Sequence, residues 1–328
     1  MIRHLMIICL LTALVLSSCF CQKTNQLDKT MIDIDNKIGN QLGYLKSSLT
    51  QVTLLAESIF SNDYEVESDT SLYELYDKSI YKKVNNGKTA MFSTGYIAPN
   101  QEIFKRIYLT EGLENIFVNF INVNQQVTQI YYNDRLSFNR IYPWIDVLSQ
   151  FPYNTNICEY PFYFMADDQY NPDRSVITID NLYIDPAGRG WVFSIIAPIY
   201  NGDTLEGVLG IDLLISDLLD RIKELDKQSY FVMQENGTVI AASKAVKTLL
   251  EIPSKSSVKY LSPTQGDTSL SNEFKLSHSK NVSLRQLYED IKLKKQINKI
   301  RINDSEFRLV YRTLKDINWT VVLLQGMK

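Results

Sequence analysis

Residues 191–212 read WVFSIIAPIYNGDTLEGVLGID and contain two apolar runs, Trp191–Tyr200 and Leu205–Ile211. The runs are separated by Asn201-Gly202-Asp203. Asn-Gly between apolar runs is a strong signal for a tight β-hairpin, because both residues tolerate the positive φ angles of the turn. This stretch therefore predicts two long antiparallel strands.

Similar short apolar runs bounded by turn residues occur on both sides of this hairpin. The further strands expected from them are Ile116–Ile121, Val127–Tyr132, Tyr230–Met233, Val239–Ala242, Glu306–Thr313 and Trp319–Leu324. Helices are expected over Asp217–Leu225, with Ser216 as the N-cap, and over Leu284–Ile297. Strands beside an end helix, twice in succession, predict an α+β protein of two lobes with antiparallel sheets.

A long amphipathic helix is expected ahead of the two lobes. Apolar residues recur there at alternating three- and four-residue steps, and we refer to this row as the seam. Its members are Leu27, Met31, Ile34, Ile38, Leu42, Leu45, Leu49, Val52, Ala56 and Ile59. At about 1.5 Å per residue the helix is roughly 50 Å long. We expect the seam to lie along both lobes, with a coiled-coil dimer as the alternative.

The N-terminus carries the features of an export signal. Arg3 precedes an almost wholly apolar stretch from Leu5 to Leu16, which is followed by small residues. The run Leu16-Ser17-Ser18-Cys19 resembles a lipobox, in which the cysteine thiol is acylated and the chain is cut just before it. We therefore expect an exported protein that is anchored to the bacterial cell envelope through lipid on Cys19. An uncleaved anchor helix is the alternative, although the stretch is short for one.

The composition argues against several functional classes. The net charge is −3, which does not suggest nucleic-acid binding. The chain contains two histidines and four cysteines, and their spacing matches no metal motif. Asp167, Asp168 and Asp173 match no calcium loop, so a solvated loop is expected there. No catalytic residue, metal site or cofactor is therefore expected.

Three stretches, taken together and in order, resemble the double Cache family of extracytoplasmic sensor domains. They are Asn139–Trp144, Tyr183–Trp191 and Gly207–Asp212, which read NRIYPW, YIDPAGRGW and GVLGID. The resemblance implies a long N-terminal helix that carries two PAS-like lobes. With the export signal, the expected domains are a signal peptide over 1–18, a lipid-anchored N-terminus and long helix over 19–60, a membrane-distal lobe over 61–225 and a membrane-proximal lobe over 226–328.

The resemblance also implies a ligand site in the membrane-distal lobe. In amino-acid-binding members, a Tyr-x-Asp motif and a later Asp hold the ligand's ammonium group; the matching residues here are Tyr183, Asp185 and Asp212. An Arg before Pro-Trp holds the carboxylate in those members, but Tyr142 stands in that place, with Trp144 after it. Tyrosine offers neither a charge nor a bidentate fork. The expected ligand is therefore amine-bearing or amino-acid-like, with a neutral polar molecule as an alternative.

Each of these residues has a structural alternative. Asp185 could start the turn into the following strand, and Asp212 could help to cap the next helix. Trp144 could be a core anchor that contacts no ligand. Arg140, within the first of the three stretches, is expected to form a structural ion pair.

These features predict an extracytoplasmic small-molecule sensor lipoprotein and not an enzyme. No output domain is expected after the second lobe, so signalling is expected through a partner receptor or kinase. A surface or scaffold lipoprotein that uses the same fold for protein contacts is the alternative. An enzyme could use Asp185 and Asp212 as acid and base, but no nucleophile or metal set accompanies them.

Overall fold

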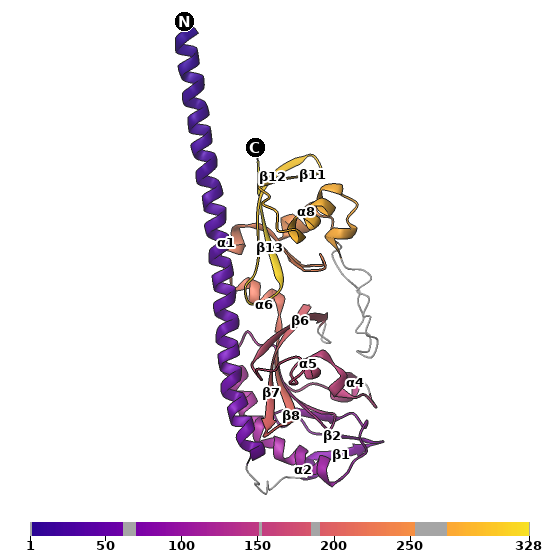
Figure 1. The fold of residues 1–328 in the computed structure, drawn as a ribbon. Coiled ribbons are helices and arrows are strands. Elements are labelled where there is room, and N and C mark those ends of the chain that lie inside the picture. The colour runs from indigo at the N-terminus through magenta and orange to yellow at the C-terminus, as the bar shows by residue number, and fades with distance from the viewer. Residues whose placement is uncertain (1, 62–69, 151–152, 185–190, 253–273, 328) are drawn as a thin grey trace. The chain divides into compact units, whose positions relative to one another are not determined.

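The long N-terminal helix is present as predicted. The computed structural model describes residues 2–61, 70–150, 153–184, 191–252 and 274–327, with side chains in the first helix described from residue 26 onward. Helix α1 runs without a break over Ile2–Ser61, including both of its glycines (Figure 1). The seam is buried within the single chain from Leu27 to Ala56. Its apolar side chains therefore pack against the chain's own lobes.

The chain divides into two compact units that share α1. Unit 1 contains the described residues of Met1–Asn40, Leu219–Ser256 and Asn272–Lys328, whereas unit 2 contains those of Gln41–Leu218. No helix in the described part of the chain combines the length and the apolar character that are needed to cross a membrane.

Unit 2 is built on an eight-stranded antiparallel sheet with the strand order β1-β2-β3-β5-β4-β8-β7-β6. The strands are β1 (Tyr73–Tyr76), β2 (Ser79–Lys82), β3 (Ala90–Ser93), β4 (Gln129–Asp134), β5 (Phe138–Tyr142), β6 (Ile177–Ile184), β7 (Trp191–Asn201) and β8 (Thr204–Leu214). Strands β7 and β8 are the predicted hairpin, in which Asn201 pairs with Thr204. Gly202 in the turn has a φ of 62°, which favours glycine.

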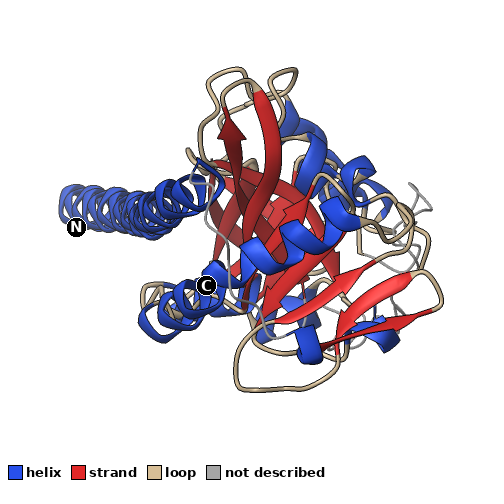
Figure 2. Ribbon diagram, turned by 90° about the horizontal axis from the view of Figure 1, so that it is seen from below, coloured by secondary structure: helices blue, strands red, loops and turns tan. Residues whose placement is uncertain are grey.

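Helices cover both faces of this sheet. Helices α2 (Gln101–Leu109) and α3 (Glu114–Val123) lie across one face (Figure 2), and the short helices α4 (Val147–Gln150) and α5 (Pro161–Phe164) lie on the other. The predicted strand Ile116–Ile121 is wrong, because these residues belong to α3. Phe117 and Phe120 are buried at helical spacing. A six-residue apolar run does not distinguish a strand from a buried helix.

Unit 1 holds the second sheet, which has the strand order β10-β9-β13-β12-β11. Its elements are α6 (Ile215–Asp220, which begins in unit 2), β9 (Ser229–Gln234), β10 (Val239–Ala242), α7 (Lys244–Leu249), α8 (Val282–Lys292), β11 (Lys299–Ile302), β12 (Ser305–Thr313) and β13 (Trp319–Gly326). Both units also contain single 3-10 turns. In unit 2 they lie at Thr70–Leu72, Thr110–Leu113 and Ile157–Glu159, and in unit 1 at Leu225–Lys227 and Leu276–His278. Both predicted helices end early, at Asp220 instead of Leu225 and at Lys292 instead of Ile297.

Helix α1 is fixed to this sheet by polar contacts near its middle. Asp35 is buried and accepts hydrogen bonds from Arg312 Nη1 (3.2 Å) and from the Lys315 backbone N–H (3.3 Å). A Cβ atom at Gly39 would lie 2.6 Å from Asp316 Oδ2, so glycine permits a close approach of the helix there. The predicted α+β fold, a long helix with two antiparallel sheets, is confirmed.

Candidate functional site

Adjacent tyrosines in β4 point to opposite faces of the eight-stranded sheet, because side chains alternate along a strand. The Tyr132 ring lies against Phe138, and its hydroxyl lies near Arg106 of α2. We call this side the α2–α3 face. The Tyr131 ring instead joins Ile141 and Val147 of α4 in one buried cluster, and we call this side the α4–α5 face.

The centre of the α4–α5 face is polar. Asp212 of β8 is only 1% exposed and is paired laterally with Ser194 of β7 and with Gln129 of β4. Ser194 Oγ donates a hydrogen bond to Asp212 Oδ1 at 2.6 Å, and Gln129 Nε2 donates to Asp212 Oδ2. Both donors are neutral groups. The strand register thus presents a buried carboxylate that is held in one orientation.

Two tyrosines accompany this carboxylate. Burial, and then the charge of Asp212, raise the pKa of Tyr183 and of Tyr131 well above the ordinary tyrosine value. Both phenols therefore stay protonated at physiological pH. Tyr131 is 5% exposed, and its hydroxyl lies beside Asp212 and Ser194. Asp212, Tyr131 and Tyr183 thus form one buried polar cluster.

Apolar side chains flank the polar centre on both sides. One cluster contains Ala90, Phe92, Tyr131, Ile141 and Val147, with Trp144 packed against it. The other contains Ile157, Tyr163, Ala166, Ile179, Ile196 and Val208, with Phe162 packed against it. The Phe162 ring meets Tyr131 edge-on at 6.2 Å and stacks on Tyr160 at 5.1 Å. A carboxylate between apolar and aromatic walls suits a small molecule with one charged end.

The GVLGID motif has a steric explanation in this arrangement. A Cβ atom at Gly210 would lie 2.1 Å from the Tyr131 ring, and one at Gly207 would lie 2.4 Å from the Tyr132 ring. Both tyrosine rings lie flat on β8, and only glycine leaves room for them. Gly207 therefore makes room for the Tyr132 ring on the α2–α3 face, and Gly210 sets the position of Tyr131 beside Asp212.

The structure brings together some of the predicted site residues and not others. Tyr183 and Asp212 lie together, and Trp144 is half-buried against the cluster that contains Tyr131. The alternation of β5 places Tyr142 on the same face as Arg140, opposite to the Asp212 side. Asp185 lies outside the described residues.

Sequence reasoning missed Tyr131, Ser194 and Gln129. Ser194 stands out as a polar residue within the apolar run, but the turn alone would set it opposite Ile211; a register shift between Ile199 and Tyr200 brings it opposite Asp212. Tyr131 could not have been found in this way. Its position depends on the pairing of β4 with β8, and these strands lie far apart in the sequence.

Arg140 has the structural role that the sequence suggested. It is fully buried on the α2–α3 face, and its Nη1 lies 2.9 Å from Glu114 Oε1. Lys82 is also fully buried and donates to the same oxygen at 2.6 Å. Burial alone would raise the pKa of Glu114, but Arg140 and Lys82 hold this pKa below its ordinary value. The cluster joins β2, β5 and α3.

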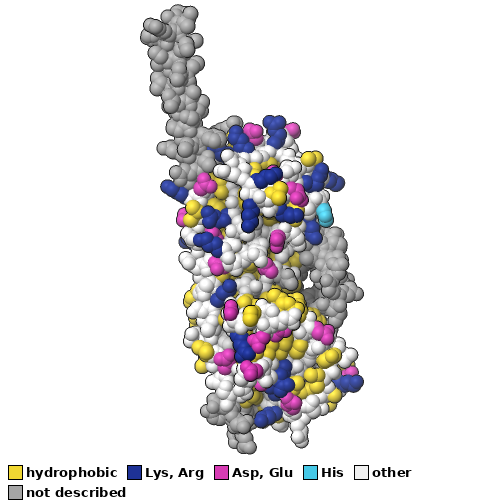
Figure 3. Space-filling view, in the orientation of Figure 1, with side chains coloured by type: hydrophobic (Ala, Val, Ile, Leu, Met, Phe, Trp, Pro, Cys, Tyr) yellow, Lys and Arg dark blue, Asp and Glu magenta, His cyan; other side chains and the backbone are white. Residues whose placement is uncertain are grey.

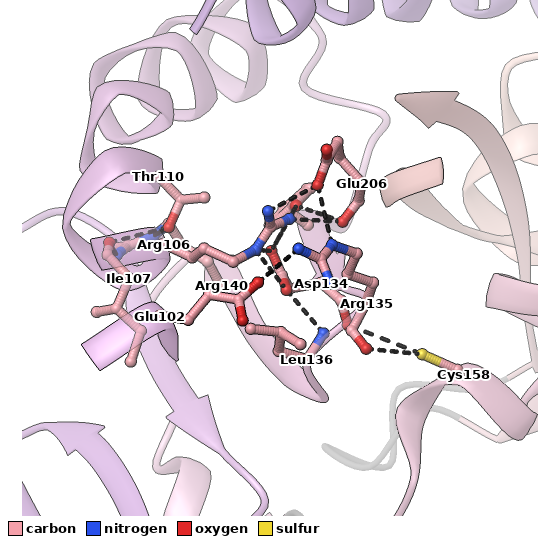
Figure 4. Close-up of polar contacts among 11 residues, drawn as sticks. Glu102, Arg106, Ile107, Thr110, Asp134, Arg135, Leu136, Arg140, Cys158 and Glu206 are labelled. Carbon is pink, nitrogen blue, oxygen red and sulfur yellow. Dashed lines mark hydrogen bonds and ion pairs between the residues drawn. The ribbon is translucent and has the colours of Figure 1, made fainter. Parts of the chain in front are cut away.

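A second ion cluster ties α2 to the sheet (Figure 4). Arg106 lies 2.7 Å from Asp134 Oδ2 and 2.6 Å from Glu206 Oε2, and the Tyr132 hydroxyl donates to Asp134. Burial raises the pKa of Asp134, although Arg106 opposes this shift. Arg135 pairs with Glu206 as well. These opposite charges satisfy one another, so we assign the cluster to the fold and not to binding.

The acidic loop expected to be solvated makes local contacts. Asp168 pairs with Arg174 at 2.9 Å, and Asp167 Oδ1 accepts from the Gln169 backbone N–H. Among the residues that the structure describes, no group of three or more His, Cys, Asp or Glu side chains is placed to hold a metal ion.

No family model and no curated protein matches the sequence. Solved structures do match. The sensory domain of the Campylobacter jejuni chemoreceptor Tlp3 with isoleucine bound has a TM-score of 0.53 and 12% identity, over 94% of this chain and 95% of that chain. The Tlp3 domain in complex with L-valine has a TM-score of 0.52 and 12% identity, over 94% and 95%.

A third match is to a chemoreceptor from another organism. The ligand-binding domain of the Pseudomonas fluorescens chemoreceptor CtaA, in complex with L-alanine, has a TM-score of 0.50 and 12% identity, over 92% of this chain and 96% of that chain. These similarities extend over both sheets and the long helix. The chain therefore has the fold of the double Cache sensory domains.

Proposed function

We propose that this protein is an extracytoplasmic sensor that binds a small amine-bearing molecule on the α4–α5 face of unit 2. The observation that carries the proposal is the buried carboxylate of Asp212 beside the buried phenols of Tyr131 and Tyr183. The structural neighbours support it, because their names describe chemoreceptor domains that bind isoleucine, valine or alanine.

The chemistry of the site favours a cation. A desolvated ammonium group is stable only beside an anionic partner and with its N–H groups hydrogen-bonded. In our proposal Asp212 supplies the charge, and the oxygens of Tyr131 and Tyr183 accept further N–H bonds. Asp185 is proposed as a second carboxylate, and Trp144 as an apolar wall. The two apolar clusters would hold the rest of the ligand.

The proposal favours an amine over an α-amino acid. A bidentate carboxylate contact needs a guanidinium fork, which tyrosine lacks. Tyr142 replaces the arginine of the resemblance, and the alternation of β5 turns it toward the α2–α3 face. The side chain of Tyr142 would therefore not point at the ligand. Tyr142 would affect the ligand only by positioning its neighbours Pro143 and Trp144 at the end of β5.

We further propose that the protein is lipid-anchored through Cys19 and signals to a partner receptor or kinase. A bound ligand can change a partner's state only if the partner has different affinities for the liganded and unliganded shapes. The scaffold function, in which the fold serves protein contacts alone, is the competing hypothesis.

Thermal unfolding against matched ligand pairs tests the proposal. Each primary amine is paired with the alcohol of the same skeleton and with the corresponding α-amino acid. A ligand at about 100 times its Kd adds roughly 2.7 kcal/mol to the free energy of unfolding. We expect one amine to raise Tm by several degrees while its alcohol has no effect. A flat response to every pair would contradict ligand sensing and favour the scaffold.

A further inference from the structure

A cationic surface on unit 1 has no part in the proposed ligand site. The segment 292–301 contains five basic residues and no acidic one. They are Lys292, Lys294, Lys295, Lys299 and Arg301, and all five are exposed. We call them the cationic edge, because they follow the turn from α8 into β11, the edge strand of the sheet. Lys and Arg side chains (dark blue) gather around α8, β11 and β12 in Figure 3.

The local structure directs these side chains outward. Ile300 and Ile302 of β11 are buried under α8, so Lys299 and Arg301 point away from it. Within the turn, Leu293 is 64% exposed between two lysines. The turn therefore presents an apolar side chain surrounded by positive charge.

This charge is concentrated in one part of the chain. Residues 274–327 contain eleven Lys and Arg against five Asp and Glu, whereas the whole chain has a net charge of −3. Among the ion pairs of this segment, Lys295 pairs with Asp290 at 2.7 Å. The excess of positive charge remains after this pair is counted. Such an asymmetry within one chain is typical of a surface that meets an anionic partner.

We propose that the cationic edge docks on an anionic phospholipid bilayer. The cations are spread along a strand and a turn instead of converging on one point, which suits a plane of headgroups. An exposed leucine between lysines can enter the headgroup layer. The proposal rests on the proposed export and anchoring, because Cys19, the proposed lipid site, belongs to the same unit. Each cation near such a surface strengthens binding about fivefold.

Vesicle sedimentation tests this proposal. The chain is used from Gln22 onward, which removes the apolar stretch and keeps every described buried residue of α1, the first of which is Leu27. We expect binding to vesicles that contain phosphatidylglycerol, no binding to pure phosphatidylcholine, and loss of binding in high salt. Lys292→Gln combined with Lys294→Gln should weaken binding roughly 25-fold.

The matched control is Lys244→Gln combined with Lys247→Gln. These lysines are exposed on α7 of the same unit, and the variant removes the same charge. Binding should stay within about twofold of the original protein. Equal weakening by both variants, equal binding to neutral vesicles, or displacement by millimolar inorganic phosphate would each overturn the proposal.

The ligand assay separates this proposal from the proposed function. The Lys292→Gln/Lys294→Gln variant should keep any ligand-induced rise in Tm, because the ligand site lies in unit 2. Failure of vesicle binding with a normal ligand response removes only the bilayer proposal. A flat ligand response with normal vesicle binding removes only the sensing proposal.

Discussion

At the scale of single residues, the candidate site depends on Asp212 and on the side chains that hold it. Ser194 and Gln129 fix the carboxylate from the two neighbouring strands. Asparagine has the same shape as aspartate but lacks its charge. A substitution at this position therefore separates the electrostatic role of the residue from its packing.

We predict that Asp212→Asn weakens binding of the preferred amine about ten- to a hundredfold. The reason is that a charge-assisted hydrogen bond contributes roughly 1.5–3 kcal/mol. Calorimetric titration measures the affinity, and thermal unfolding checks that the fold is kept. Asp146→Asn is the control, because Asp146 is exposed in the segment next to α4. Equal affinities in the original protein and in Asp212→Asn would place the site elsewhere.

Two glycines give opposite predictions for the same substitution. Gly210→Ala should destabilise unit 2 by about 1–3 kcal/mol, because the added Cβ would lie 2.1 Å from the Tyr131 ring. Gly43→Ala should stabilise the protein by up to about 1 kcal/mol, because Gly43 is exposed within α1 with no atom in the way. Chemical denaturation measures both. Gly210→Ala with normal stability would show that Tyr131 moves freely.

At the scale of elements, the success of sequence prediction depended on how local the signal was. The β7–β8 and β9–β10 hairpins carry their turn residues between their strands, so short-range patterns predicted them. The seam extends over many turns of α1, and its alternating three- and four-residue steps identify a helix. Helix α3 was missed because its apolar run is short and its burial comes from packing across the sheet. The pairing of β4 with β8, which places Tyr131, left no local signal.

The buried ion cluster between α3 and the sheet should govern stability in acid. Arg140 and Lys82 hold the pKa of Glu114 below its ordinary value, so the folded state favours the ionised form. That stabilisation is complete above the unfolded pKa and is lost as the pH falls through the folded pKa. We predict that the free energy of unfolding drops steeply below about pH 4.5.

Glu114→Gln tests this assignment. It should cost about 3–5 kcal/mol at pH 7, because two buried cations lose their counter-charge. It should also make the acid branch of the stability curve shallower, so the two proteins converge at low pH. Glu102→Gln is the control, since this carboxylate is more than half exposed and its loss costs at most about 1 kcal/mol. Parallel curves for the original protein and Glu114→Gln would contradict the prediction.

At the scale of the whole molecule, the fold agrees with the resemblance that the three motifs suggested, whereas the compartment stays a prediction. We expect Cys19→Ala to abolish incorporation of labelled fatty acid and to leave the precursor uncut, because the acylated thiol is lost. Cys21→Ala is a matched control two residues away and should label normally. Metabolic labelling followed by electrophoresis measures both. Persistent labelling of Cys19→Ala would disprove the lipoprotein hypothesis.

The sharing of α1 between the two units has a consequence for the order of folding. The described part of unit 2 ends in sequence at Leu218, when 110 of the 328 residues, from Leu219 to Lys328, have yet to follow. A chain that emerges N-terminus first can therefore fold unit 2 before the rest of unit 1 has been synthesised. Until β9 to β13 arrive, the stretch of seam from Leu27 to Ile38 has no sheet to cover it. During that interval the nascent chain exposes an apolar helix face, to which a chaperone that holds unfolded chains would bind.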